Sequence, residues 1–171
     1  LSVNLSMVQL SSDKELIEQI IQLLKTTGCN PAWIGLEVTE SLMMNNPDKT
    51  IGLLNELHEL GFLISMDDFG TGYSSLSYLK QMPISKLKID KSFIDGLPDD
   101  EGDISMARSV IGLAKNMKLE VIAEGVEREE QKNFLLENGC HEIQGYLYAK
   151  PMDVEKMTAL LKEHNEMQLE K

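Results

Sequence analysis

Residues 33–70, WIGLEVTESLMMNNPDKTIGLLNELHELGFLISMDDFG, decide the fold class of this chain. The segment opens with an apolar run that is typical of a strand. Residues 47–60 then show a helical pattern, with Pro47 suited to the first helical turn and Gly61 directly after the last. A second apolar run, residues 62–66, follows the glycine. A strand, a helix and another strand at this spacing indicate two parallel strands joined by a crossover helix.

The same alternation continues before and after this unit. We expect strands at residues 1–6, 33–38, 62–66, 86–89, 119–123 and within 142–148, and helices at residues 13–27, 47–60, 103–117, 128–138 and 153–164. Strict alternation of strands and helices predicts an α/β fold with a parallel sheet. Two architectures have this order, an open doubly wound sheet and a (β/α) barrel with pieces missing.

Polar residues near the ends of the strands favour the barrel. Each predicted strand carries one at or near its C-terminal end: Asn4, Glu37, Asp67, Lys88, Glu124 and Gln144. An open sheet gathers ligand groups around one switch point, whereas a barrel gathers them from many strand ends onto one face. A complete barrel has eight strands and about 250 residues, and this chain has 171. We therefore expect a TIM-like (β/α)8 barrel truncated to about six strand–helix units.

The composition disfavours several classes of protein. A net charge of −12 argues against a nucleic-acid polymer as partner, because binding its backbone requires a basic surface. Cys29 and Cys140 are the only cysteines and lie far apart, which favours a reduced, cytosolic protein over a disulfide scaffold. The three histidines lack the spacing of zinc ligands, and no apolar run is long enough to cross a membrane. A small anionic substrate remains compatible with this charge if metal ions supply positive charge.

The strand-end residues have the chemistry of a magnesium or manganese site. Oxygen ligands are offered by Asn4, Glu37, Asp67, Asp68 and Glu124. Hard oxygen ligands suit Mg²⁺ or Mn²⁺, and a carboxylate shared between two ions is typical of two-metal phosphoryl chemistry. Lys88 would then hold the attacking water or the developing charge on phosphorus. The alternative is that each acid is a helix cap or a turn residue, which is common for one position but explains six in register poorly.

The motifs also resemble a known family. VNLS, LEVTES, MDDFGTGYSSLSYLK, LKIDKSFI, VIAEGVE and QGYLYAKP, in this order and spacing, closely resemble the EAL-domain cyclic-di-GMP phosphodiesterases. The match spans nearly the whole chain, and the long DDFGTGYSSL and AEGVE strings make it specific. The resemblance implies hydrolysis of the bacterial second messenger cyclic-di-GMP to linear pGpG, with two Mg²⁺ or Mn²⁺ ions in the complete site.

The resemblance also implies a role for each matching residue. Five residues look like metal ligands: Asn4, Glu37, Asp67, Asp68 and Glu124. Of these, Asp67 would be shared by both ions. Three others look like catalytic residues: Lys88 at the catalytic water, Gln144 orienting water, and Glu40 anchoring the loop after DDFG. In the family this loop links metal and substrate binding to dimerisation. Glu127 is expected to support the ligands without touching a metal.

The chain departs from the family pattern at its beginning. The Glu-Ala-Leu tripeptide of the second strand, whose glutamate is also a metal ligand, does not occur in it. Residues 1–171 are therefore expected to be a partial EAL domain without the first two strand–helix units, inactive by itself. An open barrel edge would favour pairing with a second copy. Family members are often fused to GGDEF or sensory domains, so the expected location is the cytoplasm or the cytoplasmic part of a membrane-anchored protein.

Two other functions remain open from the sequence. One is a catalytically inactive EAL domain that binds cyclic-di-GMP and passes the signal to a partner. The other ignores the resemblance and is a Mg²⁺-dependent barrel enzyme that acts on a different phosphate or carboxylate substrate. The retained ligand residues favour the phosphodiesterase over the inactive binding module.

Overall fold

The computed structural model describes residues 1–6, 13–44, 46–72 and 76–169. Its centre is one sheet whose strands follow one another in chain order, each parallel to the next. The strands are β1 (Ser2–Asn4), β2 (Gly35–Thr39), β3 (Leu63–Phe69), β4 (Lys86–Ile89), β5 (Glu120–Ala123) and β6 (Glu142–Ile143). Sequential order without reversal belongs to a barrel wall, since a doubly wound sheet reverses at its switch point. The prediction of a truncated TIM-like barrel is confirmed.

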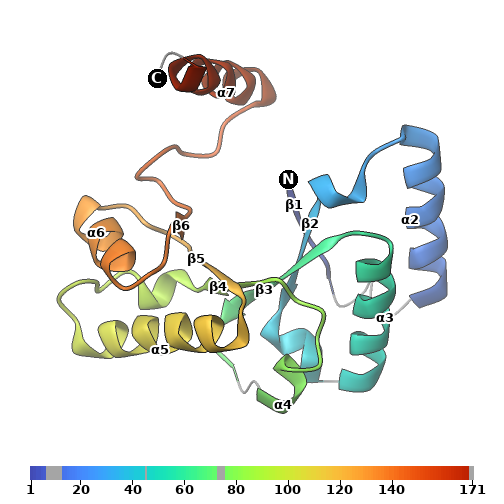
Figure 1. Cartoon of the computed structure of the whole chain (residues 1–171), viewed down its shortest axis with the longest axis horizontal. Helices are drawn as coiled ribbons and strands as arrows, with labels where there is room; N and C mark the ends of the chain where they lie inside the picture. Colours follow the sequence, from blue (N-terminus) through green and yellow to red (C-terminus); the bar gives the residue numbers. More distant parts are fainter. Residues whose placement is uncertain (7–12, 45, 73–75, 170–171) are drawn as a thin grey trace.

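Helices connect the strands and cover the outer face of the sheet (Figure 1). In the described part of the chain they are α2 (Asp13–Thr27), α3 (Pro47–Glu59), α4 (Leu76–Leu79), α5 (Glu101–Met117), α6 (Glu129–Glu137) and α7 (Val154–Leu169). Three short 3₁₀ turns also occur in it, η1 (Pro31–Trp33), η2 (Glu40–Met44) and η3 (Lys91–Phe93). Figure 1 shows α2 and α3 side by side on one flank and α7 set apart from the sheet.

Several predicted boundaries were wrong by a few residues, and the last helix, predicted at 153–164, runs to Leu169. Trp33 lies in η1 instead of a strand, because the Asn30 side chain accepts the Ala32 amide at 3.0 Å and caps the turn. The helix predicted at 103–117, α5, starts at Glu101, since Asp100 caps it. The strand predicted at 62–66 continues to Phe69, which places both aspartates of the DDFG motif inside β3.

Alternate residues of the strands face opposite sides of the sheet, and this alternation separates core from site. The core lies between the outer face and the helices, where Leu36 and Val38 of β2, Ile64 and Met66 of β3, and Leu87 and Ile89 of β4 are all buried. From α3, the apolar stripe Ile51, Leu54 and Leu57 packs into the same core. Because these apolar side chains are buried on the outer face, the side chains between them in each strand must point to the inner face.

The inner face is hollowed and lined by both polar and apolar side chains. It forms a pocket of about 580 Å³ whose lining includes Glu37, Ser65, Lys86, Lys88 and Glu120. These residues alternate with the core residues along their strands, so the hydrophobic pattern orients them inward. Within the described residues, no helix combines the length and apolar character needed to span a bilayer.

Candidate metal and active site

All six strand-end residues lie at the C-terminal end of the sheet. Asn4 ends β1 and pairs in register with Glu37 of β2. Asp67 and Lys88 lie near the ends of β3 and β4. Glu124 and Gln144 directly follow β5 and β6. Because the strands are parallel, one edge of the half-barrel carries every one of these groups.

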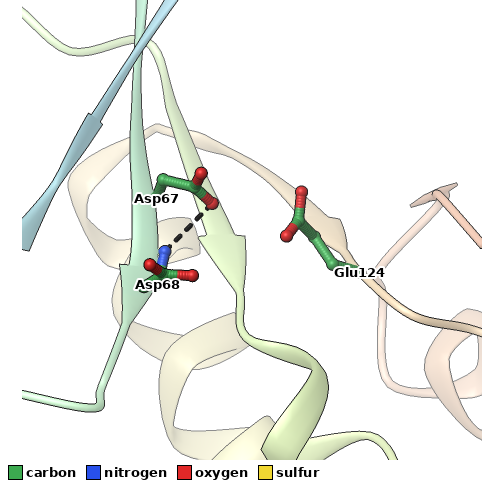
Figure 2. Close-up of side chains that lie close together, drawn as sticks. All are labelled: Asp67, Asp68 and Glu124. Atoms are coloured by element: carbon green, nitrogen blue, oxygen red, sulfur yellow. Dashed lines mark hydrogen bonds between the residues drawn. The ribbon is translucent and has the colours of Figure 1, made fainter. Parts of the chain in front are cut away.

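A β-bulge explains how two adjacent aspartates serve one site. Simple alternation would point Asp67 inward with Ser65 and Asp68 outward with Met66. The register with β4 shifts between Met66 and Phe69, and Asp68 has the left-handed backbone angle φ of 52°. A bulge of this kind changes the direction of a side chain. Figure 2 shows both aspartates on β3, joined by a 3.0 Å hydrogen bond from the Asp68 amide to Asp67 Oδ1.

Three carboxylates can meet at one point of this edge. Asp67, Asp68 and Glu124 each offer an oxygen within 4.8 Å of the others. Glu124 arrives from the segment after β5, and its carboxylate points toward Asp67 (Figure 2). Asp67 and Asp68 are neighbours, whereas Glu124 is 56 residues further along the chain, so only the closure of the sheet brings Glu124 to the two aspartates.

Lys88 is the centre of the cluster. Its ammonium is buried, and its Nζ lies 2.9 Å from Glu37 Oε2 and 3.0 Å from Asp67 Oδ1. The shortest ion pair, at 2.6 Å, joins it to Glu124 Oε1. One lysine therefore connects residues of β2 and β3 with the segment after β5. Glu37, which is outside the three-carboxylate group, is joined to it through this lysine.

The electrostatics of the cluster favour additional positive charge. Burial by itself would lower the pKa of Lys88, but hydrogen bonds with three carboxylates, led by Glu124, raise the pKa above that of an ordinary lysine. Burial raises the pKa of Glu124, and Lys88 only partly offsets this. Burial and the charge of Asp67 also raise the pKa of Asp68. Four acidic groups around one ammonium thus leave an excess of negative charge that a divalent cation would neutralise.

Asn4 and Gln144 occupy the predicted edge, but their side chains are exposed. The backbone of Gln144 is well held: its amide donates to Ala123 O at 2.8 Å, and its carbonyl accepts from the Val126 amide at 3.0 Å. Asn4 therefore lies beside Glu37 on the next strand, and Gln144 lines the same pocket as Glu37 and Lys88.

Glu40 holds the loop that follows the two aspartates. It is the first residue of η2 and is only 3% exposed. Its Oε2 accepts the amides of Gly70 at 3.3 Å and Gly72 at 3.1 Å. A β-carbon on Gly72 would lie 2.9 Å from the Glu40 carboxyl carbon, so the loop approaches too closely for a side chain. Residues 73–75 of this loop lie outside the described residues.

We expect Glu40→Ala to destabilise the domain by about 2 kcal/mol, because two backbone amides would lose a buried, charged acceptor. The free energy of unfolding in urea measures the effect. Glu56→Ala on the exposed side of α3 is the matched control and should change stability by less than about 0.5 kcal/mol. Equal stability of the two variants would contradict the anchoring role of Glu40.

The sequence reasoning missed a second ion-pair layer beneath the site. Lys86 pairs with Glu142 and lies 3.4 Å from Glu120 Oε2. Lys86 is two residues before Lys88 in the KLKI strand, so both lysines face inward. Side chains two residues apart in a strand share a face, and this spacing of Lys86 and Lys88 was the signal that would have revealed the second ion-pair layer.

Comparison with known proteins identifies the family of this chain. The family model of the EAL domain matches residues 1–151. The chain belongs to the EAL-domain family. The cyclic di-GMP phosphodiesterase NbdA of Pseudomonas aeruginosa is 43% identical over 147 residues, 86% of this EAL chain and 19% of that protein. The cyclic di-GMP phosphodiesterase PdeR of Escherichia coli is 37% identical over 151 residues, 88% of this chain and 23% of that protein. The chain thus spans about a fifth of the length of these relatives.

Solved EAL structures share the fold. The phosphodiesterase PaMucR in complex with c-di-GMP superimposes with a TM-score of 0.86 at 41% identity, over 91% of this chain and 63% of that one. A manganese and cyclic-di-GMP complex of Klebsiella pneumoniae BlrP1 superimposes with a TM-score of 0.80 at 28% identity, over 88% of this chain and 38% of that one. These similarities support the truncated-barrel fold on independent structures.

Proposed function

We propose that the complete domain containing this EAL chain hydrolyses cyclic-di-GMP to linear pGpG by a two-metal mechanism. The single observation that carries the proposal is the junction at Lys88, where one buried ammonium meets Glu37, Asp67 and Glu124. Holding so many carboxylates close together at the strand ends costs free energy, and bound cations with an anionic substrate would offset this cost. Relatives named as phosphodiesterases support the choice of substrate.

The donor set fits Mg²⁺ or Mn²⁺. Asp67, Asp68 and Glu124 supply converging carboxylate oxygens, and no sulfur or imidazole group is part of the cluster among the described residues. Glu37 and Asn4 would complete the ligands on the side of β1 and β2. When bound, two such ions supply a hydroxide at neutral pH and neutralise the phosphate. BlrP1 was solved with manganese and with calcium, which is consistent with hard oxygen ligands in this family.

The protein groups have distinct tasks in this proposal. Lys88 is charged in the metal-free cluster, where its pKa is raised, and would offer this positive charge to the attacking oxygen or the phosphate. Asp67 and Asp68 are held in place by the bulge and by the amide hydrogen bond between them. Glu40 holds the Gly70 and Gly72 amides of the loop after the two aspartates, and Gln144 would orient water from the rim. Glu127 would support Glu124 from outside.

The remaining proposals concern the whole protein. We propose that residues 1–171 form part of an EAL domain whose first two strand–helix units complete the ligand set and the substrate site, so that this piece alone is inactive. The exposed Val3 of the edge strand β1, and Leu1 directly before this strand, fit pairing with other chain segments or a second copy in a homodimer. A cytoplasmic location and fusion to GGDEF or sensory domains would suit a second-messenger enzyme.

The test is incubation of the complete protein with cyclic-di-GMP and Mg²⁺ or Mn²⁺, with pGpG measured by chromatography. We expect pGpG to form with either metal and to disappear with a chelator. Tight binding of cyclic-di-GMP without pGpG would instead support the inactive binding module. Stabilisation against heat by a different phosphate compound, but not by cyclic-di-GMP, would overturn the substrate assignment.

A further inference from the structure

A second lysine–glutamate pair joins the segments that carry Lys88 and Glu124. Lys91 of η3 lies three residues after Lys88, and Glu127 lies three residues after Glu124. The Nζ of Lys91 is 2.6 Å from Glu127 Oε1, the same distance as in the inner pair. Lys91 Nζ also lies 3.8 Å from Asp95 Oδ1. Two ion pairs therefore join β4 and the turn after it to the segment after β5. Lys88–Glu124 lies inside the barrel, and Lys91–Glu127 lies on its rim.

The stem of Lys91 also packs directly on the backbone beside Glu124. Gly125 has a left-handed φ of +69°, and a β-carbon there would lie 2.4 Å from Lys91 Cγ and 2.6 Å from Cδ. Contacts that short leave no space between the lysine methylenes and the glycine Cα. The backbone after Glu124 thus passes directly beneath the Lys91 side chain at Gly125, where only glycine fits.

The opposite side of the same segment is closed by backbone. The Val126 amide donates to Gln144 O at 3.0 Å, and the Leu147 amide donates to Val126 O at 3.0 Å. A β-carbon on Gly145 would lie 2.1 Å from Val126 O, so these two segments are in direct backbone contact. The segment that carries Glu124 is held between Lys91 on one side and the residues after β6 on the other.

We propose that Lys91 is a positioning residue, whose side chain clamps the backbone at Gly125 and thereby sets where the Glu124 carboxylate meets Asp67 and Asp68. The consequence for metal binding rests on the proposed function, whereas the clamp itself does not. The Lys91 side chain is 48% exposed, and an exposed ion pair contributes little to global stability. Its loss should consequently affect the site more than the fold. Partners that orient ligands from outside the metal commonly change metal affinity by about 10- to 100-fold.

The test compares wild type, Lys91→Ala and Lys91→Arg in the complete protein. Lys156→Ala is the matched control, since it removes an exposed ion pair of similar length, 2.9 Å to Asp153, on α7 away from the site. The first readout is hydrogen exchange of a peptide covering residues 120–128 in the metal-free protein. The second is Mn²⁺ affinity by calorimetry, and the third is kcat and KM for cyclic-di-GMP.

We expect exchange about 10-fold faster and Mn²⁺ affinity about 10-fold weaker in Lys91→Ala, with kcat reduced more than KM is changed. Lys91→Arg should restore both values to within about threefold, because arginine keeps the stem and the charge. Lys156→Ala should match wild type. Unchanged exchange and unchanged Mn²⁺ affinity in Lys91→Ala would overturn the clamp. Faster exchange in a protein that makes no pGpG in any form would leave the clamp standing and reject the phosphodiesterase.

Discussion

Replacement of Lys88 by methionine is expected to abolish turnover and to destabilise the metal-free domain by about 3 kcal/mol or more. The ammonium is buried and lies within 3.0 Å of three carboxylates. Methionine fills a similar volume but leaves those carboxylates without their counter-charge. The loss of a positive charge at the reacting phosphate should lower kcat for pGpG formation by at least about 100-fold. Unfolding in urea with a chelator present, and pGpG assays, measure the two effects.

The instability of Lys88→Met should depend on pH in a defined direction. In wild type the raised pKa of Lys88 adds stability that is lost only in strongly alkaline solution, so this lysine contributes no slope between pH 5 and 7. In the variant, burial still raises the pKa of Glu124 but the lowering by Lys88 is lost, so the folded pKa of this carboxyl lies further above its unfolded value of about 4. The folded state then binds more protons than the unfolded state, and stability falls as pH rises. The deficit relative to wild type should therefore be smaller at pH 5 than at pH 7.

Lys86→Met is the matched control for charge removal inside the barrel. Lys86 is on the same strand and face as Lys88 and pairs with Glu120 and Glu142, but it lies one layer below the site. We expect this variant to lose some stability and to keep turnover within a few-fold of wild type. If Lys88→Met kept a tenth of wild-type turnover, the Lys88 charge would not be needed for catalysis. If its loss of stability relative to wild type were the same at pH 5 and pH 7, the charge would not be needed to offset the carboxylates.

The second large effect is expected for Asp67→Asn, with opposite consequences for activity and stability. Asparagine has the same shape and keeps an oxygen for the Asp68 amide hydrogen bond. It removes the charge of the carboxylate that the proposal shares between both ions. We expect turnover to fall by at least about 1,000-fold, which corresponds to about 4 kcal/mol of barrier, together with weaker Mn²⁺ binding.

Stability of the metal-free Asp67→Asn protein should be unchanged or higher at neutral pH. The Asp67 charge contributes to raising the pKa of Asp68, so its removal relieves repulsion between the two neighbours. The matched control is Asp99→Asn in the exposed segment before α5, which should alter neither property. Asp67→Asn with a tenth of wild-type turnover would argue against Asp67 as a shared ligand, and a strong loss of stability would show a structural role.

Local patterns in the chain were sufficient for much of the fold. Alternating apolar runs and capped helices predicted the order of strands and helices, because period and capping are properties of neighbouring residues. The strand-end positions of Glu37, Asp67 and Lys88 predicted which edge of the sheet would carry the site. Boundaries were less accurate, since caps such as Asp100 and the turn at Pro31 act over one or two residues that pattern alone does not resolve.

The sequence by itself determined the class of fold, the polar edge and the residue types of the site. Only the tertiary structure decided how they meet. It placed Lys88 between Glu37 and Glu124, redirected Asp68 by a bulge with φ of 52°, and seated the loop amides of Gly70 and Gly72 on Glu40. The reason is physical: these contacts join residues 30 to 51 positions apart, and their geometry depends on how far the strands are staggered as the sheet curves. The preferences of neighbouring residues do not determine the stagger of the strands, whereas the packing of the core beneath the sheet does.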